Sequence, residues 1–136
     1  MMKTKILIVE DQADTRLIED AMLKKHRYET VFAMDAQQVV ALARQAQPDA
    51  IILDLGLPGG HGFVVLDRLK SNTQLKGIPV IVMTSDHSPE SELRGLEAGA
   101  VAFLHKPVQE ESLIAAVECA VGRVDELQKI DTGPAR

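Results

Sequence analysis

Short apolar runs alternate with longer amphipathic segments along most of this 136-residue chain. The apolar runs have strand length, and the segments between them repeat their apolar residues with helical spacing. Strands are predicted at 6–9, 30–33, 50–53, 80–83 and 101–104, and helices at 13–25, 36–46, 62–71, 88–98 and 110 to about 129. The first helix is expected to bury one apolar face made of Ala13, Leu17, Ile18, Ala21 and Met22.

This (βα)5 pattern predicts an α/β fold, a doubly wound five-stranded parallel sheet. Strands that are apolar almost throughout are typical of parallel sheets covered by helices on both faces. Crossover connections are right-handed almost without exception, which makes the flavodoxin-like strand order 2-1-3-4-5 the economical topology. Local signals agree with this reading: Pro48 follows the second helix, Ser88 and Pro89 open the fourth, and Gly99 ends it.

Length and composition narrow the class of protein. The chain has the size of one domain, expected at residues 1–122, with a helix extension and flexible tail at 123–136. A net charge of −5 argues against sequence-independent binding to nucleic acid or to anionic membranes, and no apolar run is long enough to span a bilayer. The single cysteine, Cys119, fits a reducing cytoplasm and is expected to be a small buried hydrophobe.

The last helix keeps a 4-3-4-3 spacing of apolar residues beyond the expected end of the domain, at Leu113, Val117, Ala120, Val124 and Leu127. This spacing is compatible with a coiled coil leading to a partner or an output domain, but it covers only about two heptads. A solvated helix end is therefore the favoured interpretation. No further domain is recognisable after it, which leaves open whether this domain stands alone or belongs to a longer chain.

Polar residues follow the ends of four of the predicted strands. Glu10 and Asp11 follow the first, Asp54 the third, Thr84 the fourth, and His105-Lys106-Pro107 the fifth. Because parallel strands end at the same edge of a sheet, these side chains are expected to meet there, around the point where the strand order reverses.

Three clustered carboxylates need a cation or a proton. At ~4 Å and an effective dielectric of ~20, each pair costs about 4 kcal/mol. Oxygen ligands suit Mg²⁺, which prefers one or two carboxylates together with water and a phosphoryl oxygen. With the ammonium of Lys106 and the hydroxyl of Thr84, the set fits phosphoryl transfer to a carboxylate, with catalysis by positioning and charge neutralisation.

These residues lie in motifs that resemble the receiver domains of two-component response regulators: ILIVEDQ, IILDLGLPGGHG, VIVMTS and FLHKP. The resemblance implies that Asp54 is the phospho-acceptor, Lys106 contacts the phosphoryl group, and Thr84 is the switch hydroxyl. It implies Mg²⁺, or alternatively Mn²⁺, on Asp11, Asp54 and the Gly56 carbonyl, with Glu10 supporting through water. It also implies a cis Lys106-Pro107 peptide, and it makes Phe103 either a switch aromatic or an ordinary core residue.

The resemblance further implies a cytoplasmic signalling module that is not an enzyme on separate substrates, although it catalyses its own phosphorylation and dephosphorylation. A histidine kinase or phosphotransfer protein would supply the phosphoryl group. The face made by the fourth helix, fifth strand and fifth helix would then change and be read by an effector protein or output domain. The sequence GAVAFLHKPV lacks the acidic residues of the dimer face of winged-helix regulators, so a monomer or weak dimer is expected.

Two other readings stay open. A small aspartate-nucleophile phosphatase on the same fold is the enzyme alternative, but that class usually carries D-x-D, and Gly56 stands two residues after Asp54. A degenerate receiver that no longer accepts phosphate is disfavoured by the complete residue set. The histidines at 26, 61, 87 and 105 show no metal-binding spacing, and no glycine motif supports nucleotide binding.

Overall fold

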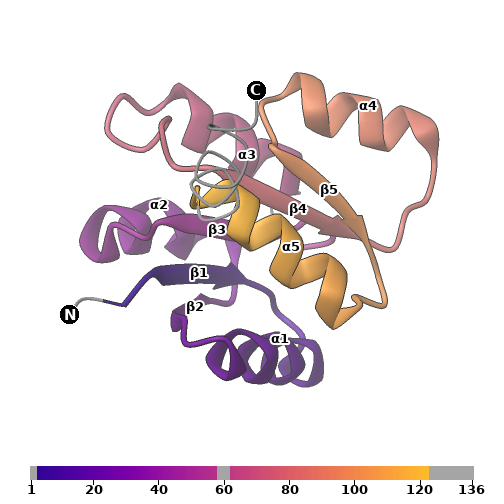
Figure 1. The fold of residues 1–136 in the computed structure, drawn as a ribbon. Coiled ribbons are helices and arrows are strands. Elements are labelled where there is room, and N and C mark those ends of the chain that lie inside the picture. Colours follow the sequence, from indigo (N-terminus) through magenta and orange to yellow (C-terminus); the bar gives the residue numbers. More distant parts are fainter. Residues whose placement is uncertain (1–2, 58–61, 123–136) are drawn as a thin grey trace, which may run out of the picture.

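The computed structural model describes residues 3–57 and 62–122 of the chain, which form five strands and five helices in alternation (Figure 1). The strands are β1 (Lys5–Val9), β2 (Glu29–Ala33), β3 (Ala50–Asp54), β4 (Val80–Thr84) and β5 (Ala102–His105). The helices are α1 (Ala13–Lys25), α2 (Ala36–Ala46), α3 (Gly62–Ser71), α4 (Pro89–Glu97) and α5 (Glu110–Ala120).

The strands form one parallel sheet in the order β2-β1-β3-β4-β5. This confirms the predicted α/β class and strand order. Three strands, β3, β4 and β5, end one residue later than expected, because Asp54 pairs with Met83 and Thr84 pairs with His105. Asp54 and Thr84 are therefore the last residues of hydrogen-bonded strands, and their backbones are held by the sheet.

Alternate residues of the central strands supply two separate apolar layers. One layer contains Leu7, Leu53 and Val82 and packs under α2 and α3. The other contains Ile8 and Ile52 and packs under α1 and α5, which lie on the same side of the sheet in Figure 1. Burial on both faces explains why these strands are apolar almost throughout.

The expected apolar face of α1 was wrong except for Met22, which is half-buried against the core. Leu17 and Ile18 are 63% and 52% exposed, whereas Glu19 is 1% exposed and Leu23 is fully buried. The helix thus lies on the sheet with an acid on its inner side and apolar residues outside. Periodicity locates a stripe of apolar residues, but it does not show that the stripe faces the core.

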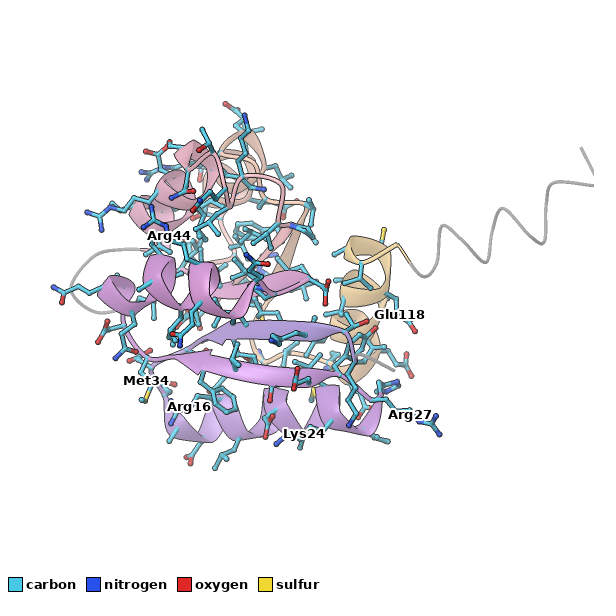
Figure 2. All side chains as sticks on the ribbon, turned by 90° about the vertical axis from the view of Figure 1, so that its left-hand side faces the viewer. Arg16, Lys24, Arg27, Met34, Arg44 and Glu118 are labelled. Atoms are coloured by element: carbon cyan, nitrogen blue, oxygen red, sulfur yellow. The ribbon has the colours of Figure 1, made fainter. Side chains whose placement is uncertain are left out.

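The exposed face of α1 lies next to exposed side chains at the end of β2. The Arg16 guanidinium lies 5.9 Å from the centre of the Phe32 ring, and Met34 just beyond β2 is 49% exposed. Figure 2 shows Arg16 and Met34 at the same end of this part of the molecule.

The helix ends largely follow the sequence signals. The Ser88 hydroxyl accepts a hydrogen bond from the Ser91 amide at 3.2 Å, and Pro89 takes the first helical position of α4. Gly99 follows α4 with a φ of +108°, a conformation that favours glycine.

The C-terminal part of the chain corrects one expectation and leaves another outside the described residues. Cys119 is exposed rather than buried, because it lies two residues after the buried Val117 and so on the opposite side of α5. The proposed coiled-coil repeat and the tail at 123–136 lie beyond the described residues.

Candidate functional site

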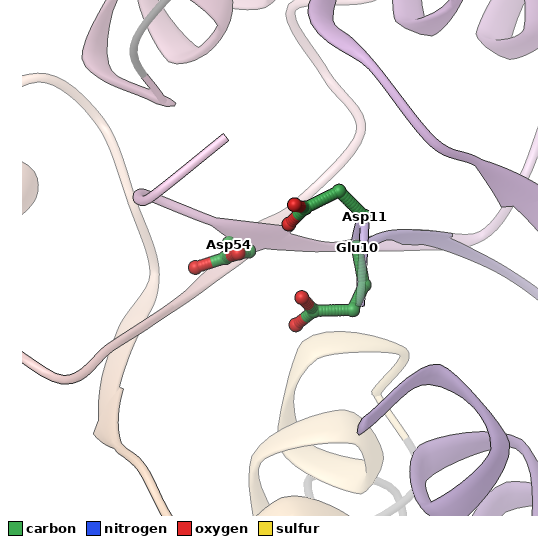
Figure 3. A group of neighbouring side chains, drawn as sticks. All are labelled: Glu10, Asp11 and Asp54. Atoms are coloured by element: carbon green, nitrogen blue, oxygen red, sulfur yellow. The ribbon is translucent and has the colours of Figure 1, made fainter. Parts of the chain in front are cut away.

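Three carboxylates meet at the carboxyl edge of the sheet, where β1 and β3 end. Glu10 and Asp11 follow β1, and Asp54 ends the neighbouring strand β3. One oxygen from each residue lies within 4.8 Å of the others, as Figure 3 illustrates. Glu10 and Asp54 are buried, at 1% and 6% exposure, so their mutual repulsion is poorly screened by water.

Lys106 supplies the opposite charge. Its ammonium lies 2.9 Å from Glu10 Oε1, to which it donates a hydrogen bond, and 3.2 Å from Asp54 Oδ1. Burial works to lower the pKa of Lys106, but its hydrogen bond to Glu10 and the charges of Asp54 and Glu10 outweigh this and raise it. Burial also raises the pKa of Glu10, and Asp54 adds to the effect. Lys106 is thus held as a cation between two buried acids.

The backbone that carries Lys106 is fixed by the end of β4. The Lys106 amide donates a hydrogen bond to the Thr84 carbonyl at 2.8 Å. The buried Thr84 hydroxyl accepts one from the Asp86 amide at 3.0 Å. The Lys106-Pro107 peptide is cis, as the resemblance implied. The hydroxyl and the ammonium therefore come from neighbouring strand ends that are bonded to each other.

The loop after Asp54 folds back tightly on the strand end. The Gly56 amide donates to Asp54 Oδ1 at 3.0 Å, which orients the carboxylate. Gly62, which opens α3, packs so closely on the Leu55 backbone that a Cβ would overlap Leu55 Cα, and its amide donates to the Leu55 carbonyl at 3.1 Å. Glycine at 62 is therefore required by space at the start of α3.

Phe103, a residue of β5, packs its ring against α4. The ring is half-buried against the α2–α3 layer, and it lies so close to Gly95 that an added Cβ there would come within 2.9 Å of two ring carbons. Its neighbour His105 meets the ring edge-on, with 5.7 Å between centres. The packing role is thus established, and the switch role of Phe103 stays a prediction.

The structure adds one residue that the sequence reasoning missed. Both carboxylate oxygens of Glu19 are buried and have no hydrogen-bond partner. Burial raises the pKa of Glu19 to about 8, and the charge of Glu10 adds to the rise while Lys106 opposes it. An acid in a surface helix is ordinary in sequence, so no sequence signal marked this position.

A groove of about 300 Å³ opens beside the acidic cluster. Thr15 and Ile18 of α1 form one wall, and the opposite side is formed by Ser85, Lys106, Pro107 and Val108. The lysine of the site is thus reachable from a surface that α1 helps to build.

The donor set at this edge fits a small hard cation. Among the described residues, Glu10, Asp11 and Asp54 make the only cluster of three or more acidic, histidine or cysteine side chains with such spacing. All three offer oxygen, which Mg²⁺ prefers, and no histidine or cysteine of the residues that the structure describes belongs to the cluster.

Residues 6–118 match the family described as the response regulator receiver domain, and the chain belongs to this family. It is 39% identical over 117 residues to the response regulator PleD of Caulobacter vibrioides, covering 85% of this chain and 26% of PleD. It is 34% identical to the protein PilH of Pseudomonas aeruginosa, covering 86% and 97%. The chemotaxis response regulator CheY4 of Vibrio cholerae has a similar structure, with a TM-score of 0.82, 29% identity and coverage of 88% and 99%.

These matches establish a signalling module of two-component systems and do not favour the phosphatase alternative. The chain spans about a quarter of PleD and about half of the phosphate regulon regulator PhoB of Escherichia coli. Within the described residues, no helix is long and apolar enough to cross a membrane.

Proposed function

We propose that the chain is a phospho-accepting receiver in which Asp54 takes a phosphoryl group from the phosphohistidine of a kinase or phosphotransfer protein. The observation that carries this proposal is the pairing of a buried carboxylate with the Lys106 ammonium, 3.2 Å away. In the transfer, a P–O bond forms to an Asp54 oxygen as the P–N bond breaks, and the imidazole leaves with its electron pair. Lys106 orients and neutralises the incoming oxygens.

Mg²⁺, or Mn²⁺ in its place, would be held by the Asp11 and Asp54 side chains and the Gly56 carbonyl, with Glu10 supporting through water. Bound there, the ion supplies charge neutralisation. The chain's own contribution is to keep the acids together: the Gly56 amide fixes one Asp54 oxygen, and Lys106 compensates Glu10. This pre-organisation limits the rearrangement needed when charge is transferred.

The donor approaches through the groove between α1 and the loop after β5. Leu17 and Ile18 are exposed on α1, and Ile18 lines the groove that reaches Lys106. Apolar side chains on the outer face of α1 are unfavourable in contact with water. They are favourable where another protein covers them, so they fit a binding surface. A kinase or phosphotransfer protein in the cytoplasm is the partner that this chemistry requires.

Phosphorylation is read through Thr84 and Phe103. Thr84 lies in the strand end bonded to Lys106, and its hydroxyl, which accepts a hydrogen bond from the Asp86 amide, donates one to a phosphoryl oxygen. Phe103, two residues before the partner of Thr84 in the sheet, links this change to α4 through Gly95. The α4–β5–α5 face then differs between two states, which an effector or output domain distinguishes. Phe103 has no hydroxyl, so the readout is one of packing and shape.

The test is incubation with acetyl phosphate and Mg²⁺, followed by intact-mass measurement. The chain should gain the mass of one phosphoryl group, and Asp54→Asn should abolish the gain. Asp67→Asn, which removes an exposed carboxylate from α3, is the matched control and should leave the gain unchanged. Rapid turnover of many phosphoesters without an adduct would instead support the phosphatase.

A further inference from the structure

The outer face of α4 and the start of β5 expose three large apolar side chains. Leu93, Leu96 and Val101 are 58%, 43% and 54% exposed. On α4, Leu93 and Leu96 lie one turn apart on the side away from the buried Gly95. Val101 follows the helix at the entry to β5. These residues form an apolar strip on the proposed output face.

Acidic residues border this strip. Glu90, Glu92 and Glu97 are all exposed on α4. The helix has one basic residue, Arg94, and its guanidinium is turned toward α3, where it lies 4.0 Å from the centre of the Phe63 ring. Lys106, the next cation along the chain, points into the carboxylate cluster. Among the described residues from α4 to the end of β5, therefore, no lysine or arginine offsets these glutamates on the outer face. Glu92 has only the His105 ring, whose Nε2 lies 3.7 Å from Glu92 Oε1.

Helix stability does not account for all of these charges. Glu90 and Glu92 stand in the first turn of α4, where the helix dipole stabilises acids. Glu97 is the last residue of the same helix, where an acid is unfavourable. Its position beside Leu93 and Leu96 thus needs another explanation, and a cationic partner provides one.

We propose that this surface, the acidic α4 face (Glu90, Glu92, Leu93, Leu96, Glu97 and Val101), binds an apolar segment with lysine or arginine on its flanks, carried by another protein. The inference rests on the proposed output role of the face and specifies its partner. A second copy of the chain is the wrong occupant, because a two-fold contact would bring these glutamates against their own counterparts. The two leucines supply an apolar contact, and Glu92 and Glu97 flank it.

The probe is a synthetic helical peptide with a leucine stripe and lysine and arginine flanks, compared with a peptide that has the same stripe and glutamate flanks. Binding to the full chain is measured by calorimetry, with and without beryllium fluoride as a phosphoryl mimic. The basic peptide should bind at least tenfold tighter, and increasing salt should weaken it. Amide chemical-shift changes should concentrate in α4 and the first residues of β5.

Two double variants with the same net charge distinguish a specific effect of the acidic α4 face from a general effect of the net charge of the chain. Glu92→Gln/Glu97→Gln should weaken the basic peptide about fivefold, as expected for two exposed charge pairs. Gln45→Lys/Gln74→Lys, which adds the same charge on exposed residues at α2 and beyond α3, should change it less than twofold. Leu96→Ser should weaken both peptides.

Three results overturn the inference. They are equal losses in the two charge variants, equal affinity for the two peptides, and a concentration-dependent dimer that Leu96→Ser abolishes. None of them depends on phosphoryl acceptance, which the mass of the acetyl phosphate adduct reports separately. A chain that forms the adduct and fails these binding tests keeps its receiver function and loses the proposed partner.

Discussion

Gly95→Ala tests whether the Phe103 ring and α4 are mechanically linked. In a helix, replacing glycine by alanine normally stabilises by about 1 kcal/mol. At this position the new Cβ would lie 2.9 Å from two carbons of the Phe103 ring, and such overpacking costs about 1–3 kcal/mol. The expected net effect is therefore a loss of about 1 kcal/mol in the free energy of unfolding.

The sign of the effect should reverse when the ring is removed. In a Phe103→Ala background the added methyl group has only Phe63, at 3.9 Å, as a further near neighbour, so Gly95→Ala should stabilise by about 1 kcal/mol. The coupling energy from the double-mutant cycle is then about 2 kcal/mol. Urea denaturation of the four proteins measures it, with midpoints interpreted at constant m-value.

Gly77→Ala is the matched control, since a Cβ there meets nothing within 4 Å. It should be neutral or slightly stabilising in both backgrounds. Equal effects of Gly95→Ala with and without the Phe103 ring would refute the proposed linkage. If the linkage holds, Gly95→Ala should also alter effector binding without preventing formation of the acetyl phosphate adduct.

Further predictions concern groups at or near the site. Burial raises the pKa of Glu19 in the folded protein to about 8, above its value in the unfolded chain, so the wild type should lose stability as the pH rises from about 5 to 8. Glu19→Gln should remove on the order of 3 kcal/mol of this loss, as measured by urea denaturation at each pH. Lys106→Met should lower stability in EDTA by about 3 kcal/mol at pH 8 and by less at pH 5, where Glu10, whose pKa is raised, can take up a proton; an equal loss at both pH values would contradict the ion-pair account. A thiol reagent should modify Cys119 in the folded protein nearly as fast as in urea, and slow modification would show that α5 is covered.

The sequence predicted the sheet and its functional edge because both follow from patterns local to each strand. Runs such as Ile51–Leu53 are apolar throughout since they are buried on both faces, and the polar residue after each run marks where the strand leaves the core. Parallel pairing then brings Asp54 and Lys106 to one edge without any knowledge of side-chain geometry. The strand ends were misjudged by one residue, because Asp54 and Thr84 are polar and still belong to the ladder.

The failures share a different cause, which is that hydropathy does not determine helix orientation. Leu17 and Ile18 are apolar and exposed, while Glu19 is charged and buried. Cys119 was judged by its sequence neighbours, but a two-residue step from Val117 reverses its direction on a helix. The contact of Phe103 with Gly95 depends on the distance between β5 and α4, which no local pattern encodes.

The orientation of α1 also has a consequence for local opening. Only Glu19 and Leu23 are buried in this thirteen-residue helix, so little apolar area holds it to the sheet. Segments with few buried apolar contacts open at low free energy and lose amide protection first. The amides of α1 should therefore exchange with deuterium before those of α3, which buries Val65, Leu66 and Leu69. Since opening lets Glu19 ionise in water, this exchange should accelerate by more than the intrinsic rate between about pH 5 and 8, and should follow the intrinsic rate above pH 8, where Glu19 is ionised in both states. This makes α1 the part of the domain that loosens first as the pH rises toward 8.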